Sequence, residues 1–386
     1  MALLKERLTV YCVSRCKYRC LSGAEDRISV SKSKLQDKFL SVTLKSNKVI
    51  IMSKAIVVKS PGGLDNLSII DRDIPSPQAG EVTVQWHATS LNYHDYLVAV
   101  GGIPVEDGRV PMSDGAGEII AVGEGVSRWN KGDKVMSLFF PNWLEGRPSV
   151  ARTKIINGET VDGYICEQSN ISVESITRIP KGYTYAQAAT LPCAAATAWR
   201  GLMVEGGLQS GQKVLIEGTG GMSIFGLQMA KAAGAIVYAT TSSPAKAERL
   251  KSLGASEVVN YREDERWGNT IFKLSGGGVD HVLDVGGGST MNQSIEATGI
   301  DGHISSIGIL SGGRKGQITF PKLFFKHIRL IGIAVGSREM QEDLVDFIEQ
   351  HNIQPIIDKS FGFDQLADAF RYQESGQHFG KIVVQW

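Results

Sequence analysis

One short segment restricts the fold of this chain more than any other: a glycine-rich turn, Gly218–Gly221, that joins two apolar patterns. The residues before it, "VLIE" at 214–217, are typical of a buried strand, and Phe225, Met229 and Ala233 after it recur at helical spacing. A strand, a tight glycine turn and a helix in this order predict a dinucleotide-binding crossover. Gly218, Gly220 and Gly221 would let the backbone approach a pyrophosphate at the helix N-terminus.

The segment departs twice from the usual dinucleotide fingerprint. Ser223 stands where the last glycine would ease helix–strand packing, but serine is small enough for the turn to keep its function. The next strand ends at Thr240–Ser243 with no acid, although an NAD site uses a carboxylate there for the ribose 2′-hydroxyl. Thr241 is neutral, and Lys246 and Arg249 follow in the next helix, so we expect NADP(H) rather than NAD(H). A solvated helix face is the alternative interpretation of the two cations.

Strand and helix patterns alternate from about residue 187 to residue 337. The strand patterns are near-continuously apolar, as in a parallel sheet buried on both faces: "VLIEG", "IVYATT", "EVVNY", "HVLDVG", "HISSIGIL" and "RLIGIAVG". Residues 52–179 read instead as short β-strands separated by Gly, Pro and Asn turns. After residue 337 come a helix, "EMQEDLVDFIEQH", and a closing strand, "GKIVVQW". The fold class is therefore α/β, with a doubly wound parallel sheet and a β-rich part.

Composition and charge exclude several classes of function. The 386 residues carry a net charge of +1, so nucleic acid is not an expected partner, and no apolar run is long enough for a membrane span. Residues 1–51 differ from the rest, with 11 Lys/Arg and 4 Asp/Glu. They predict a disordered or targeting extension; their acids favour a cytoplasmic over a mitochondrial location. Three of the five cysteines lie in this tract, a pattern that fits no disulfide framework.

Several stretches together resemble the medium-chain dehydrogenase/reductase family, in its zinc-free branch of quinone oxidoreductases and "zinc-type" alcohol dehydrogenase-like proteins. They are "SLNYHDYLV", "PMSDGAGEIIAVGEGV", "LPCAAATAWRGL", "GTGGMSIFGLQMAKAAGA", "GVDHVLDVGG" and "HFGKIVV". The resemblance covers essentially all of 52–386. It implies a GroES-like catalytic domain over 52–193, a Rossmann domain over 194–337 and a C-terminal return to the catalytic domain over 338–386.

The resemblance also predicts that no zinc is bound. Zinc-dependent relatives place ligands at the positions of Asn92, Ser113, Asp114 and Cys193, where only the cysteine keeps a chemistry that zinc favours. The interval that would carry the four-cysteine structural zinc site, about 137–164, contains no cysteine. We expect Cys193 to be a buried structural residue.

The resemblance implies which residues surround NADPH. The turn 218–223 would hold the pyrophosphate, and Ser242, Lys246 and Tyr261 would surround the adenosine 2′-phosphate. The ends of two later strands would line the nicotinamide. Thr197 would lie near the nicotinamide carboxamide, and Lys381 would close over the cofactor. These expected cofactor residues are Thr197, Gly218, Thr219, Gly220, Gly221, Met222, Ser223, Thr241, Ser242, Lys246, Tyr261, Val285, Gly286, Ile307, Gly308, Ile309 and Lys381.

The segment "LNYHDY" is expected to line the substrate pocket. Asn92 would donate to the substrate oxygen, and Tyr93 or His94 would donate a proton, whereas Asp95 would orient a neighbour or brace the backbone. Asp114 would cap a turn. Without a metal, such donors suffice for hydride addition to an activated acceptor, a quinone or an α,β-unsaturated carbonyl. Metal-free alcohol/ketone chemistry and a non-catalytic NADPH-binding role are the alternatives.

Assembly is also predicted from the resemblance. Residues 329–337, "RLIGIAVGS", read as the last strand of the cofactor sheet, and an exposed apolar edge strand favours pairing with its copy in a homodimer.

Overall fold

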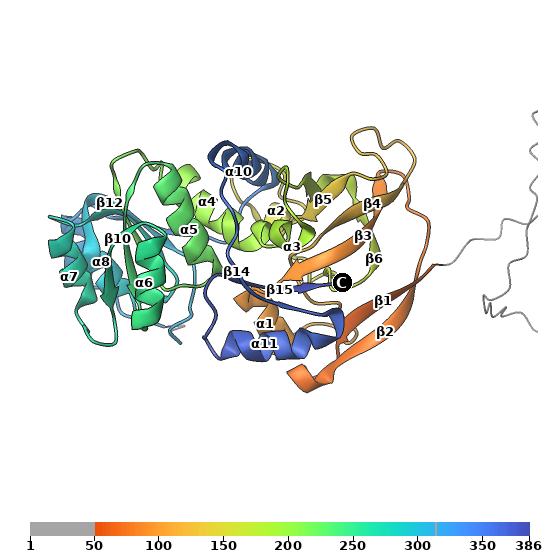
Figure 1. Ribbon diagram of the computed structural model, residues 1–386, viewed down its shortest axis with the longest axis horizontal. Helices are drawn as coiled ribbons and strands as arrows, with labels where there is room; N and C mark the ends of the chain where they lie inside the picture. Colours follow the sequence, from red (N-terminus) through yellow and green to blue (C-terminus); the bar gives the residue numbers. More distant parts are fainter. Residues whose placement is uncertain (1–50, 313–314) are drawn as a thin grey trace, which may run out of the picture. The chain divides into compact units, whose positions relative to one another are not determined.

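The computed structural model describes residues 51–312 and 315–386, so the predictions for residues 1–50 lie outside it. Its strands form two large sheets and one two-stranded ribbon (Figure 1). The ribbon pairs β1 (Ile51–Val58) with β2 (Leu67–Ile74) in antiparallel register. Among the described residues, no helix is both long and apolar enough to cross a bilayer.

The first large sheet has six parallel strands in the order β10-β9-β8-β11-β12-β13. Their bounds are β8 (Lys213–Glu217), β9 (Ile236–Thr241), β10 (Ala255–Asn260), β11 (Val279–Asp284), β12 (Thr298–Ser306) and β13 (Arg329–Gly332). This is the doubly wound dinucleotide-binding order, in which the winding reverses between β8 and β11. A ligand is expected at the carboxyl ends of these two strands.

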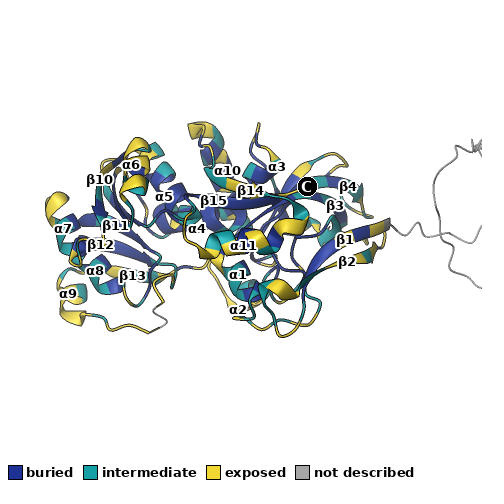
Figure 2. Ribbon diagram, turned by 60° about the horizontal axis from the view of Figure 1, so that its bottom comes forward, coloured by how far each residue is buried: buried dark blue, intermediate teal, exposed yellow. Residues whose placement is uncertain are grey.

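Helices cover both faces of this sheet, because alternate strand residues pack to opposite sides. Leu215 and Val282 pack with α7 (Trp267–Leu274) and α8 (Met291–Ala297). Val214 and Ile216 pack with α5 (Gly221–Ala232) and α6 (Pro244–Ser252), together with α4 (Ala196–Trp199) and α10 (Arg338–His351). The four inner strands β8, β9, β11 and β12 are accordingly buried along most of their length (Figure 2), which explains their near-continuous apolar sequence.

The second large sheet is mostly antiparallel, in the order β14-β15-β3-β4-β5-β7, with β6 paired to β3. Its strands are β3 (Glu81–Ser90), β4 (Ala116–Val122), β5 (Lys134–Ser137), β6 (Gln168–Ser172), β7 (Ile176–Arg178), β14 (Ile357–Phe361) and β15 (Lys381–Gln385). The remaining helices are α1 (Tyr93–Ala99), α2 (Val150–Thr153), α3 (Tyr185–Ala188), α9 (Phe320–Phe325) and α11 (Leu366–Glu374). The α/β fold class with a parallel sheet is confirmed.

Two strands are shorter than the sequence pattern suggested. The apolar run at 303–310 leaves the sheet at Ser306. Ile307 N–H makes the last ladder bond, to Asp284 O (2.8 Å), and the chain then turns, with Leu310 N–H donating to Val285 O (3.0 Å). The run at 329–337 leaves at Gly332; Val335 then takes a positive φ of 47°, and the Arg200 guanidinium binds Ala334 O at 3.2 Å. Apolar composition alone does not distinguish a strand from a buried loop that follows it.

Candidate functional site

The glycine turn at the end of β8 leaves open space for a ligand. Gly218 has a φ of 74°, and no described atom lies within 4 Å of the point where a Cβ of Gly218 or Gly220 would stand. Gly220 is the N-cap of α5 and provides no side chain to satisfy the amides of the first turn. Met222 and Ser223 belong to this first turn, and the Ser223 hydroxyl donates to Glu217 O (2.7 Å). Ser223 therefore binds the strand instead of merely replacing a glycine.

The C-terminal return contacts this turn directly. Gly380 donates its N–H to Thr219 O (2.9 Å), and the Lys381 side chain lies so close to Gly221 that an added Cβ would stand 2.2 Å from Lys381 Cδ. Position 221 therefore requires glycine because any side chain there would collide with Lys381, a requirement that is not part of the dinucleotide fingerprint.

The cations expected near the adenosine also contact the C-terminal return. Lys246 Nζ donates to Gly376 O (2.7 Å) and His378 O (2.9 Å), and burial lowers the pKa of Lys246. Arg249 lies 3.8 Å above the Phe379 ring and 3.5 Å from Asp358. A 2′-phosphate would compete with these groups for both cations.

Three further adenosine-side residues lie near the end of β9. Thr241 is buried, Ser242 is half-buried, and the half-exposed Tyr261 donates its N–H to Thr241 O (3.0 Å). No carboxylate follows β9 in this segment, as the sequence showed.

The two turns expected beside the nicotinamide are held together by backbone bonds. Leu310 donates its N–H to Val285 O (3.0 Å), and a Cβ on Gly308 would stand 2.5 Å from that same oxygen. The turns Val285–Gly286 and Ile307–Ile309 therefore lie side by side, after β11 and β12.

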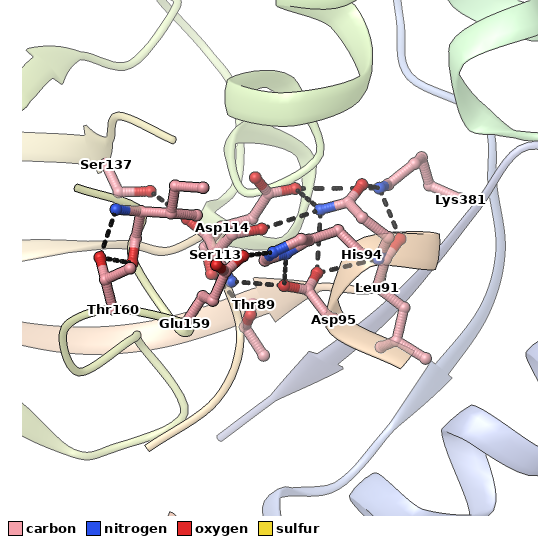
Figure 3. Close-up of polar contacts among 12 residues, drawn as sticks. Thr89, Leu91, His94, Asp95, Ser113, Asp114, Ser137, Glu159, Thr160 and Lys381 are labelled. Atoms are coloured by element: carbon pink, nitrogen blue, oxygen red, sulfur yellow. Dashed lines mark hydrogen bonds and ion pairs between the residues drawn. The ribbon is translucent and has the colours of Figure 1, made fainter. Parts of the chain in front are cut away.

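Asn92 lies at the centre of a buried polar network, in which its side-chain amide is fully used. Its partners Asp95, Asp114 and Lys381 are labelled in Figure 3. Its Nδ2 donates to Asp114 Oδ2 (2.8 Å) and Asp95 Oδ2 (3.1 Å), and its Oδ1 accepts from Lys381 Nζ (2.6 Å). As the N-cap of α1, it forms a capping box with Asp95. The hydrogens that the sequence assigned to a substrate oxygen are thus engaged with two carboxylates.

Lys381 brings a buried positive charge into this network. Its side chain is 4% exposed; Nζ donates to Leu91 O (2.7 Å) and lies 3.8 Å from Asp114 Oδ2. Asp114 is fully buried, and its Oδ1 has no hydrogen-bond partner among the described residues. Burial raises the pKa of Asp114 to about 7 against the opposing effect of the Lys381 ammonium. Asp114 is therefore part of the network and not a simple turn cap.

His94 is the network's partly exposed acid–base group. Its Nε2 lies 2.7 Å from Glu159 Oε2, and its Nδ1 lies 3.5 Å from Asp95 Oδ1. Burial alone would lower the pKa of His94, but the carboxylates of Asp95 and Glu159 raise it above its ordinary value. Tyr93, in contrast, is 40% exposed and stacks on Tyr96.

Cys193 is only partly buried, not buried as expected, and burial raises the pKa of its thiol well above the ordinary value. Cys193 O accepts from the Thr197 hydroxyl (2.7 Å), so Thr197 is tied to its own helix. Ser113 donates its N–H to Asp95 Oδ1 (2.8 Å), which confirms that Asp95 braces the backbone. Among the described residues, no three His, Cys, Asp or Glu side chains are grouped as a metal site.

Sequence reasoning missed Glu159 and the destination of the Lys381 ammonium. Glu159 lies 65 residues from His94 and Lys381 lies 289 residues from Asn92, with no local pattern that pairs them.

Comparisons with known proteins agree with this architecture. Residues 78–181 match the alcohol dehydrogenase GroES-like domain, and residues 221–350 match the zinc-binding dehydrogenase family. A zinc-type alcohol dehydrogenase-like protein of Schizosaccharomyces pombe is 41% identical over 331 residues, which are 83% of this chain and 96% of that protein.

Two further relatives are informative. Acryloyl-coenzyme A reductase of Sulfurisphaera tokodaii is 27% identical over 339 residues, which are 86% of this chain and 99% of that enzyme. The crystal structure of a putative alcohol dehydrogenase from Sinorhizobium meliloti 1021 superposes with a TM-score of 0.81 at 35% identity, covering 87% of this chain and 99% of that one.

Proposed function

The chain belongs to the medium-chain dehydrogenase/reductase family of oxidoreductases, and we propose that it is an NADP(H)-dependent, zinc-free reductase. It transfers a hydride to an activated acceptor, a quinone or an α,β-unsaturated carbonyl. The observation that carries this proposal is the Lys381 ammonium, which lies beside Asn92 and Asp114 at the positions where zinc-dependent relatives carry ligands.

The residues at these positions do not fit a zinc ion. Asn92 uses its amide within the network, Ser113 offers a neutral hydroxyl, and the raised pKa of Cys193 keeps its thiol protonated. A dication would also lie close to the Lys381 ammonium, which would repel it. The proposed reaction therefore involves no metal ion.

The glycine turn fits a dinucleotide well. The space above Gly218 and Gly220 and the uncapped N-terminus of α5 suit a pyrophosphate, which would accept hydrogen bonds from the amides of the first turn. Thr241, Ser242 and Lys246 would surround the adenosine, and their neutral or positive character favours the 2′-phosphate of NADPH.

The donor set suits conjugate addition. The reduced nicotinamide, when bound, supplies a hydride to the β-carbon of the acceptor. The developing enolate oxygen then needs a donor, and we assign this role to the protonated imidazolium of His94, whose pKa is raised by Asp95 and Glu159. Asn92 and Asp95 fix the helix that carries His94. The proton at the α-carbon comes from His94 or solvent, which balances the two-electron reduction.

The relatives support two acceptor classes. Similarity to acryloyl-coenzyme A reductase favours a conjugated C=C bond, whereas the zinc-type alcohol dehydrogenase-like relative keeps a simple carbonyl as the second candidate. The test is a screen of NADPH oxidation against quinones, enones, enoyl thioesters, aldehydes and ketones. Turnover of activated acceptors above simple ketones is expected; turnover of ketones alone would contradict the proposal.

Metal content is tested on the same preparation. Elemental analysis should find no stoichiometric zinc, and a chelator should leave turnover unchanged. One tightly held zinc per chain whose removal abolishes activity would contradict a zinc-free reaction.

We also propose that the protein is a homodimer. β13 is the last strand of its sheet, and Phe320, Phe324 and Phe325 of α9 are 63%, 56% and 72% exposed. Apolar surface next to an open strand edge favours pairing with a second copy. Mass measurement across micromolar concentrations should find a dimer; a strict monomer would contradict it.

A further inference from the structure

Two carboxyl groups lie side by side beneath the dinucleotide-binding turns. β8 and β11 pair in parallel with Leu283 opposite Ile216, so the next residues, Asp284 and Glu217, end adjacent strands at the point where the winding reverses. Both side chains reach Ser294 of α8. All three residues are buried, with Asp284 and Ser294 fully so and Glu217 4% exposed.

The hydrogen bonds of Ser294 require a proton on one of these carboxyl groups. The serine oxygen lies 2.6 Å from Glu217 Oε1 and 2.6 Å from Asp284 Oδ2. A hydroxyl has one hydrogen and can donate to only one of the two oxygens. The other contact at this length also needs a hydrogen, which must belong to the carboxyl group.

Glu217 is the better place for this proton. Burial raises the pKa of Asp284 too, but hydrogen bonds from Gly287 N–H (2.8 Å) and the Thr290 hydroxyl (3.1 Å) oppose this rise and favour its ionised form. Glu217 Oε2 has no hydrogen-bond partner among the described residues, although the amides of Val285 and Gly286 lie near. Burial and then the charge of Asp284 raise the pKa of Glu217 well above its ordinary value.

The same residues hold the turns that would contact the dinucleotide. Glu217 directly precedes Gly218, and its carbonyl accepts from Ser223 in the first turn of α5. Asp284 holds Gly287 through its side chain and Ile307 through its carbonyl. The phosphate turn and both nicotinamide-side turns therefore meet at this carboxyl pair.

We propose that Glu217 is a neutral carboxylic acid that donates a hydrogen bond to the Ser294 oxygen, while the Ser294 hydroxyl donates to Asp284. The proton on Glu217 keeps the dinucleotide-binding turns in their binding arrangement. Glu217 is thus a positioning residue for the cofactor. Loss of the Glu217 proton places two negative charges side by side, close to where a pyrophosphate binds. Asp284 on β11 is the charged group that acts most strongly on Glu217. This inference concerns either nicotinamide dinucleotide and does not depend on the acceptor.

The direction of the pH effect follows from the raised pKa. A carboxyl group that holds its proton more tightly in the folded protein stabilises the fold at low pH, and this stabilisation is lost as the pH rises through the folded-state pKa. Dinucleotide affinity is expected to fall over the same alkaline range, on the order of tenfold.

Infrared spectroscopy and binding titrations test the proposal. The wild-type protein without dinucleotide should show the C=O stretch of a protonated carboxylic acid at neutral pH, and this band should disappear in alkali. Glu217→Gln should show a weaker band, which leaves only the share of Asp114, whose pKa is also raised. The variant should bind NADPH and NADH at neutral pH as the wild type does and keep that affinity in alkali. Glu257→Gln, an exposed control on β10, should behave as the wild type.

Two results would overturn the proposal. One is a wild-type spectrum with no protonated carboxyl band at neutral pH, a measurement that needs no variant and therefore no assumption about folding. The other is a Glu217→Gln protein that retains the wild-type alkaline loss of affinity.

Discussion

The phosphate turn and the Asn92 network are the two halves of the candidate site, and they are built in opposite ways. The turn is open and made of backbone: no described atom occupies the Cβ positions of Gly218 and Gly220. The network is closed and made of side chains, with Asn92, Asp95, Asp114 and Lys381 all buried. A backbone site tolerates changes of neighbouring side chains, whereas a buried charged network fails when one partner is lost.

Lys381 joins the two halves, so its loss should have the largest effect. Lys381→Met leaves Leu91 O and Asn92 Oδ1 without their donor and Asp114 without its cation. Removing one partner of a buried charged pair costs about 3–5 kcal/mol. We expect a large drop in melting temperature and in kcat/KM, measured by thermal unfolding and steady-state kinetics.

The control for Lys381 is Lys359→Met on the neighbouring strand β14, where the side chain is exposed. This variant should unfold and turn over as the wild type does. Equal behaviour of Lys381→Met and wild type would show that the ammonium does not hold the network together.

His94 tests the chemical role of the network. As a general acid it acts when protonated, so kcat should fall as the pH rises through its raised pKa. Glu159→Gln removes one carboxylate that raises this pKa, and the alkaline fall should move to lower pH. His94→Gln should lower kcat about 100-fold and abolish that part of the pH profile.

His87→Gln is the matched control for His94, because His87 stacks on Tyr185 and lies outside the network. It should leave the pH profile of kcat unchanged. If His94→Gln also leaves the profile unchanged, His94 is not the proton donor.

Lys246 has two possible roles, which a variant can separate: it binds the 2′-phosphate of NADPH, or it holds the C-terminal return in place. If it binds the 2′-phosphate, Lys246→Ala should weaken NADPH by about 1–3 kcal/mol and leave NADH nearly unchanged. Lys246 also bonds to Gly376 O and His378 O, so its removal should loosen the segment that carries Lys381. We therefore expect a further loss of affinity that is equal for NADPH and NADH.

Dissociation constants and kcat for both cofactors measure these two contributions separately. Lys251→Ala, an exposed position on the same helix, is the control. Equal affinity of wild type and Lys246→Ala for NADPH would contradict 2′-phosphate binding by Lys246, and an NADH preference of the wild type would contradict the proposed cofactor.

Ser223 should give the smallest effect. Ser223→Gly restores the glycine of the fingerprint but removes the bond to Glu217 O and adds a flexible helix residue, at a cost of about 1 kcal/mol. NADPH affinity should change by less than about tenfold, as measured by fluorescence titration. A larger loss would show that the serine side chain takes part in the phosphate site.

The sequence by itself determined the parts of this protein whose contacts are local. The glycine turn Gly218–Gly221 lies directly between a strand and a helix, so periodicity and turn chemistry predicted the crossover and the parallel sheet. Asp95 lies three residues after Asn92 and accepts the Asn92 N–H, which is a local capping contact.

The tertiary structure alone decided the charge environment of the site. It brought Lys381 to Asn92 and Glu159 to His94, and it directed Lys246 to the backbone of the C-terminal return. It also ended two apolar runs early, at Ser306 and Gly332, after which the chain no longer continues as a strand. Burial and charge pairing depend on residues up to 290 positions apart, and no local pattern of amino acids specifies which of them meet.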